Sequence, residues 1–115
     1  MPAPSALAIA TGSVQRLLKE EASYHKELAD QEKQIKTLEE QIKSGKDDED
    51  GNAPYMLKQQ QTAAEQTRAV FGPLKKRIED AVAKLQDQIT AADETVSPGA
   101  ELDAAKAILA QATAA

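Results

Sequence analysis

Apolar residues recur along the first forty or so positions with the spacing of a heptad, a row in which two positions of every seven face a neighbouring helix. The residues that fill this row are Leu7, Ala10, Val14, Leu17, Tyr24, Leu28, Ile35, Leu38 and Ile42. Polar Glu21 and Gln31 take the two remaining places, and such interruptions fix the register of helix pairing at a cost in stability. The spacing predicts a long helix that packs lengthwise against another helix.

Local signals for helix ends set the bounds of this first helix. Ser5 is a suitable N-cap, so the helix is expected over about residues 5–43. Two glycines, Gly45 and Gly51, then bracket an acidic run and predict an exposed acidic loop over residues 44–53.

A second helix is expected over about residues 54–92, since Pro54 suits a first turn, where its missing N–H costs nothing. Gly72-Pro73 lies inside this segment, and an internal proline either ends a helix or kinks it. The buried row keeps its phase on both sides of the proline, at Ala63, Thr67, Val70, Leu74 and Ile78. We therefore predict a helix that is kinked at Gly72-Pro73 and continues beyond it.

Ser97 and Pro98 form a good N-cap and first-turn pair for a third helix over about residues 98–113. Its apolar row is Leu102, Ala105, Ile108, Leu109 and Ala112. This helix is short, so it reaches only the part of the second helix that follows the kink.

These elements predict an all-α fold, an elongated three-helix bundle that forms a single domain over residues 1–115. The two long helices must lie antiparallel, because the loop between them is short. Counting outward from the loop places Gly72-Pro73 beside Tyr24 and His25, and Phe71 beside Lys26. Phe71 and Tyr24 are therefore expected to meet at the kink. The part nearer the loop has only two helices and a weak core, so we expect it to be the mobile part.

Composition excludes several classes of protein. The chain has 115 residues, a formal net charge of −5 with both signs interleaved, and no cysteine. It is therefore a poor candidate for binding nucleic acid, for a disulfide framework or for a thiolate metal site. No apolar run reaches the roughly twenty residues that span a bilayer, and the first residues lack the features of a signal peptide. A cytoplasmic protein without a cofactor is expected.

No arrangement of residues favours catalysis. The single histidine, His25, has no nucleophile placed beside it on the helix, so a packing or solvated side chain is the preferred interpretation. The acidic run from Asp47 to Asp50 lacks the ligand spacing of a calcium loop. We therefore expect a protein that is not an enzyme.

Charged residues on the outer face of the first helix suggest a binding surface instead. Lys19, Lys26 and Lys33 recur every seven residues, opposite the apolar row. Most such rows are merely solvated, and the alternative is a docking surface for an acidic protein. The full candidate set is Arg16, Lys19, Glu20, Lys26, Glu27, Lys33, Lys75 and Arg77.

Several segments together resemble the tubulin-folding cofactor A family. Residues 13–27 are similar to the family's opening helix, with Val14, Arg16, Leu17, Lys19 and Glu20 at the positions of its Val-x-Arg-Leu-x-Lys-Glu core. The resemblance continues through residues 55–59, 70–74 and 102–109, including the proline inside the second helix.

The resemblance implies a small cytosolic three-helix bundle, associated with the cytoskeleton, that is not an enzyme. It implies binding of β-tubulin after release from the chaperonin, and transfer toward assembly with α-tubulin through other cofactors. Family members include monomers and homodimers, so both states stay open. The alternative function is a homodimeric coiled-coil adaptor or spacer that uses the heptads for self-association, and a helical inhibitor of an enzyme is a third, less supported possibility.

Overall fold

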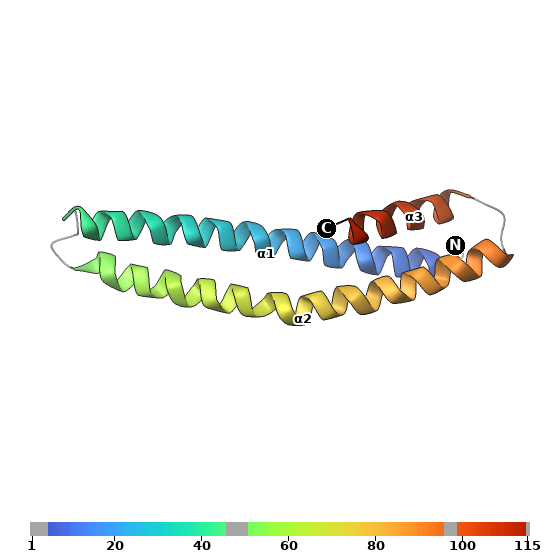
Figure 1. Ribbon diagram of the computed structural model, residues 1–115, viewed down its shortest axis with the longest axis horizontal. Coiled ribbons are helices and arrows are strands. Elements are labelled where there is room, and N and C mark those ends of the chain that lie inside the picture. The colour runs from blue at the N-terminus through green and yellow to red at the C-terminus, as the bar shows by residue number, and fades with distance from the viewer. Residues whose placement is uncertain (1–4, 46–50, 96–98, 115) are drawn as a thin grey trace. The chain divides into compact units, whose positions relative to one another are not determined.

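The computed structural model describes residues 5–45, 51–95 and 99–114, and the regular structure in these ranges is entirely helical. Helix α1 spans Ala6–Lys43, α2 spans Asn52–Thr95 and α3 spans Ala100–Thr113 (Figure 1). The predicted all-α fold with two long helices and a short third one is confirmed. Helix α2 extends beyond the predicted range of 54–92 at both of its ends.

Both ends of α1 carry the signals that the sequence predicted. The backbone N–H of Ala8 donates a hydrogen bond to Ser5 Oγ at 3.0 Å, so Ser5 caps the helix. At the other end, Gly45 has φ of +75° and donates its N–H to the carbonyl of Ile42 at 3.3 Å. Only glycine adopts this left-handed backbone readily, which explains why the helix stops here.

Helix α2 passes through Pro73 without ending. Proline cannot donate the hydrogen bond to the preceding turn, so the helix lacks one backbone bond at this point. Thr67 on one side and Leu74 and Ile78 on the other are all buried, and the packed face of the helix is therefore continuous in phase. This agrees with the prediction that the helix continues beyond the proline.

The predicted start of α3 is wrong. Its N-cap is Gly99, whose extended backbone (φ −159°, ψ −178°) leads into Ala100. The pair proposed for this role, Ser97 and Pro98, lies outside the described residues. Glu101 and Asp103 in the first turn place negative charge near the positive end of the helix dipole, which favours a helix here even without a side-chain cap.

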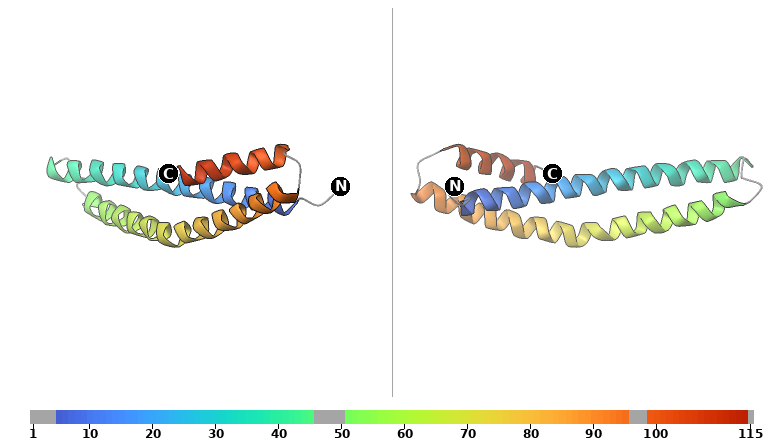
Figure 2. Two further views of the ribbon diagram at one scale, coloured as in Figure 1. Left: turned by 45° about the vertical axis from the view of Figure 1, so that its right-hand side comes forward. Right: turned by 180° about the vertical axis from the view of Figure 1, so that it is seen from behind.

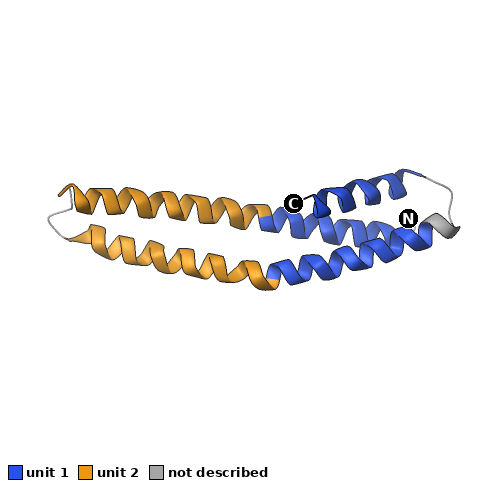
Figure 3. Ribbon diagram, in the orientation of Figure 1, with its two compact units in different colours: residues 1–21, 74–115 blue, residues 22–73 orange. Residues whose placement is uncertain are grey.

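Residues 1–21 and 74–115 form one compact unit, unit 1, and residues 22–73 form another, unit 2 (Figure 3). In unit 1, α3 lies beside α1 and α2, as the views from different sides agree (Figure 2). Its buried core takes two residues from each helix: Leu7, Val14, Leu85, Ile89, Leu102 and Ala105. Unit 1 is thus a three-helix unit around an aliphatic core.

Unit 2 is an antiparallel pair made by the second part of α1 and the first part of α2. Its buried residues are Leu38, Ala53, Ala64 and Thr67. Three of these four are small or polar, and Thr67 satisfies its hydroxyl by donating to the carbonyl of Ala63 at 3.0 Å. Because small side chains remove little apolar surface from water, unit 2 has the poorer core of the two.

The heptad predicted for α1 describes its packed face in unit 2, whereas in unit 1 Leu18, which lies outside the row, also packs against the core. Every position of the row from Leu7 to Ile42 is buried or half-buried, including the polar Glu21 and Gln31. Gln31 Oε1 is buried and has no hydrogen-bond partner among the described residues. The row therefore faces α2 and α3 within the chain, which leaves it unavailable for the self-association that the coiled-coil alternative requires.

Candidate partner-binding surfaces

An aromatic cluster in unit 2 defines the role of the single histidine. The ring of His25 stacks on Phe71 with 4.5 Å between ring centroids and 26° between planes, and Tyr24 meets the same ring edge-on at 6.5 Å. The predicted meeting of Tyr24 and Phe71 is confirmed. His25 is exposed at the surface and acts as a packing residue, since its ring covers Phe71.

The described residues contain no group of three or more His, Asp or Glu side chains that could hold a metal ion. Over the same residues, none of the three helices combines the length and the apolar character that crossing a bilayer requires.

Lys26 and Glu27 line a shallow groove of about 340 Å³ in unit 2, together with Asp30, Gln31 and Gln60. Its walls are charged or carry amides, and the half-buried Gln31 belongs to them. Such a groove offers hydrogen bonds and charge, together with the aliphatic parts of the side chains that line it. It suits a polar contact that orients a partner rather than one that supplies most of the affinity.

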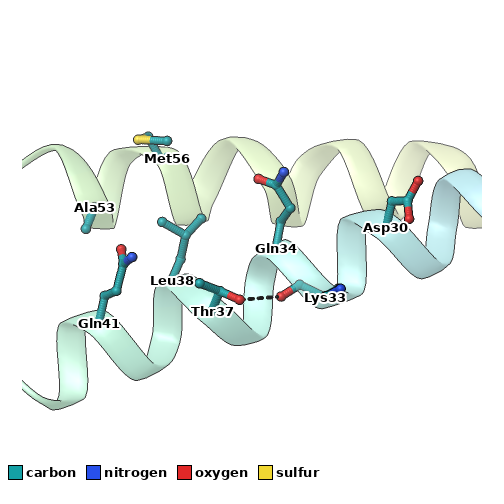
Figure 4. Close-up of a pocket in the computed structure, with 8 residues that line it drawn as sticks. All are labelled: Asp30, Lys33, Gln34, Thr37, Leu38, Gln41, Ala53 and Met56. Carbon is teal, nitrogen blue, oxygen red and sulfur yellow. Dashed lines mark hydrogen bonds between the residues drawn. The ribbon is translucent and has the colours of Figure 1, made fainter.

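Lys33 lines a larger groove of about 730 Å³, nearer the end of α1 (Figure 4). Leu38 and Ala53, which also line it, are buried, while Met56 is 45% exposed. The hydroxyl of Thr37 donates to the carbonyl of Lys33 at 3.0 Å, so its hydrogen bond is made within the helix. The groove thus combines the adaptable apolar surface of Met56 on α2 with the positive charge of Lys33 on α1.

The other candidates belong to unit 1. Arg77 Nη1 lies 3.5 Å from Glu20 Oε1, so these two residues form an ion pair across α1 and α2. The Arg77 side chain is exposed and that of Glu20 is half-buried, so the pair contributes little to stability. Arg16 donates to Ser13 Oγ at 3.5 Å, and Lys19 and Lys75 are exposed. The cationic side chains of this set thus remain accessible to a partner.

Sequence reasoning did not single out three large apolar residues that the structure exposes: Tyr55 at 62%, Ile9 at 57% and Met56 at 45%. The sequence pattern did indicate their exposure, because each of these residues falls outside the buried row of its helix. Isolated exposed apolar residues are common on proteins, so their position becomes informative only when the structure places them beside a groove.

Comparison with known proteins gives two matches. The family model described as tubulin binding cofactor A matches residues 2–109. The crystal structure of tubulin folding cofactor A from Arabidopsis thaliana is similar, with a TM-score of 0.73 and 30% sequence identity, over 95% of this chain and 94% of that chain. No curated protein matches the sequence.

Proposed function

Because this chain belongs to the tubulin binding cofactor A family, we propose that it is a tubulin-folding chaperone that captures β-tubulin folding intermediates and stabilises them for assembly of the α/β-tubulin heterodimer. The observation that carries the proposal is the family match, which extends over residues 2–109. In this role the protein is a non-enzymatic binding partner that works in the cytoplasm, in association with the cytoskeleton, and passes its client to other tubulin-folding cofactors.

The physical basis of the proposal is a pre-ordered polar surface. Helices α1 and α2 are formed before any partner binds, so a complex loses little free energy to the ordering of the chaperone backbone. A client that still has to complete its folding and find its partner must also be released. Contacts that are mainly polar and exposed favour such reversible binding over permanent burial.

The proposed contact residues are the outward-facing charges of α1 and α2. They are Arg16, Lys19, Glu20, Lys26, Glu27, Lys33, Lys75 and Arg77. All of them are exposed except Glu20, which is half-buried beside Arg77. Their expected contribution is long-range attraction and orientation of an acidic client surface, which raises the association rate more than it slows dissociation.

The test measures binding of freshly chaperonin-released β-tubulin to the full chain, with α-tubulin as the comparison. We expect a one-to-one complex with β-tubulin and none with α-tubulin. In the variant Lys19→Glu, Lys26→Glu, Lys33→Glu the association rate should fall by about tenfold at low salt, and the salt dependence should weaken.

The matched control is Lys43→Glu, Lys58→Glu, Lys76→Glu, which makes the same change in net charge at three exposed lysines outside the candidate set. If the control slows association as much as the test variant, the lysine row is not the site and only net charge matters. Absence of a β-tubulin complex with the unmodified chain would overturn the proposed function itself.

A further inference from the structure

The groove of about 730 Å³ in unit 2 lies between α1 and α2, and no residue of α3 lines it. Leu38 of α1 and Ala53 of α2 point into the space between the two helices and form its floor (Figure 4). Both are buried, and the small side chain of Ala53 fills little of that space. The groove is therefore a shallow, two-helix surface with an apolar floor.

Unit 1 shows which third element a pair formed by α1 and α2 accepts. There the amphipathic helix α3 packs on both long helices and buries Leu102 and Ala105 in a shared aliphatic core. Unit 2 has parts of the same two helices but buries small residues such as Ala53 and Ala64 between them. A third helix on this pair would remove further apolar surface from water, as α3 does in unit 1.

The walls of the groove suit a helix better than an extended peptide. Gln34, Thr37 and Gln41 on α1 are spaced by three and four residues, so they form a ridge along which a second helix can pack. The backbone of α1 and α2 is already hydrogen-bonded within each helix and offers nothing to a strand. Met56 on α2 is 45% exposed and adapts its shape to an apolar side chain that docks beside it.

Two charges in the groove define the polarity of the occupant. Asp30 and Lys33 both line it, and neither forms an ion pair with another described residue. They lie three residues apart on α1, which places them about one helical turn apart. A docked helix with a basic and an acidic residue at matching positions would pair with both, and the order of the two charges would fix its direction.

We propose that this groove docks an amphipathic helix of the client protein, whose apolar row contacts Met56 and whose flanking charges pair with Asp30 and Lys33. The inference rests on the proposed function, because a folding intermediate exposes helices whose apolar faces still lack their native partners. Unit 2 and the docked helix together form a three-helix unit. The small apolar area of the groove keeps this contact reversible, as a chaperone that releases its client requires.

The first test measures the dissociation constant of the full chain for freshly chaperonin-released β-tubulin. In Met56→Glu, a charge replaces the apolar contact, and the dissociation constant should rise at least about tenfold. Tyr55→Glu is the matched control, because Tyr55 is the neighbouring residue, is 62% exposed and does not line the groove. This control should change the dissociation constant by less than about twofold.

The second test exchanges the two charges without changing the net charge of the chain. In the double variant Asp30→Lys, Lys33→Asp, the dissociation constant should rise by about fivefold or more, since each charge would meet its own sign on the client. The exchange Lys36→Glu, Glu39→Lys is the control at two exposed residues of α1 that do not line the groove. It should leave binding nearly unchanged.

The third test identifies the segment of the client that occupies the groove. The chain has no cysteine, so Met56→Cys provides a single thiol for attachment of a photo-crosslinker. Peptide mapping of the crosslinked complex should find a segment of the client with apolar residues at helical spacing. A crosslinked segment without this spacing would overturn the assignment of a helix.

The outcomes separate this inference from the proposed function. Absence of a complex with the unmodified chain overturns the proposed function, and the inference fails with it. A complex that the unmodified chain and Met56→Glu form equally well overturns the groove alone, as does an equal loss in Met56→Glu and Tyr55→Glu. Helical content measured by circular dichroism confirms that each variant is folded.

Discussion

Gln31 has an amide at a position where the heptad of α1 favours an aliphatic side chain. Its Oε1 atom is buried in unit 2 and has no hydrogen-bond partner among the described residues. A buried acceptor that loses water without gaining a donor costs about 1–3 kcal/mol. The native residue is therefore less stabilising than an apolar residue of similar size would be.

We predict that Gln31→Leu raises the free energy of unfolding by about 1–2 kcal/mol, since it removes this penalty and adds buried apolar surface. Urea denaturation monitored by circular dichroism measures the change. Gln34→Leu is the matched control, because Gln34 is exposed and its substitution should leave stability nearly unchanged. A loss of stability in Gln31→Leu would show that the amide makes a favourable hydrogen bond.

At the scale of single residues, sequence predicted which side chains of α1 are buried, because burial along a helix follows from its period. It also predicted that Lys19, Lys26 and Lys33 would be exposed. It could not predict the Glu20–Arg77 ion pair, nor the missing partner of Gln31. Both depend on side-chain positions across two helices, which no local pattern specifies.

Helix α2 tolerates both residues that usually interrupt a helix, Gly72 and Pro73, while α1 tolerates Gly12. A Cβ atom added to either glycine would meet nothing within 4 Å. Substitution by alanine would therefore cause no clash with the rest of the protein. The two sites differ in the next residue of the chain, because Gly72 precedes a proline, and a Cβ before proline disfavours helical backbone.

We predict that Gly12→Ala raises the free energy of unfolding by about 0.5–1 kcal/mol, through lower conformational entropy of the unfolded chain and higher helix propensity. Gly72→Ala should give a clearly smaller gain, since the following Pro73 offsets the benefit. Thermal and urea unfolding of the two variants, measured side by side, make the comparison. Equal gains would show that Pro73 imposes no restriction on its neighbour.

The ends of helices were predicted well where adjacent residues determine them. They were predicted poorly where contacts between residues far apart in sequence determine them. Ser5 caps α1 as expected, and Gly45 follows the helix at the start of the predicted loop, since helix ends depend on a few adjacent residues. Helix α3 begins at Ala100, after Gly99, although Ser97 and Pro98 looked more favourable. Glu101 at its start accepts a hydrogen bond from Ser5 Oγ at 2.8 Å, a contact between residues far apart in sequence that local preferences cannot include.

At the scale of the whole molecule, the two units differ in what stabilises them. Unit 1 buries leucine, valine and isoleucine from three helices, whereas unit 2 buries mainly small and polar side chains between two. Local opening of a structure is easiest where few apolar contacts must be broken. The sequence allowed this contrast to be predicted, since the third apolar row is too short to reach both parts.

We predict that amide hydrogens in residues 28–42 of α1 exchange at least about tenfold faster than those in residues 8–20 of the same helix. Hydrogen exchange followed by mass spectrometry of the free chain measures both segments in one experiment. The comparison within a single helix provides its own control for solvent conditions. Equal protection of the two segments would mean that unit 2 is as stable as unit 1 despite its poorer core.

The division into units also has a consequence for the order in which the protein is synthesised. Unit 1 combines residues 1–21 with residues 74–115, and all of unit 2 lies between them in the chain. A ribosome therefore completes the two-helix pair with the weaker core before it has made the segments that close the stronger one. During this interval the apolar face of residues 7–18 lacks the native partners that residues 74–115 later supply, so unit 1 can fold only after unit 2 has been made.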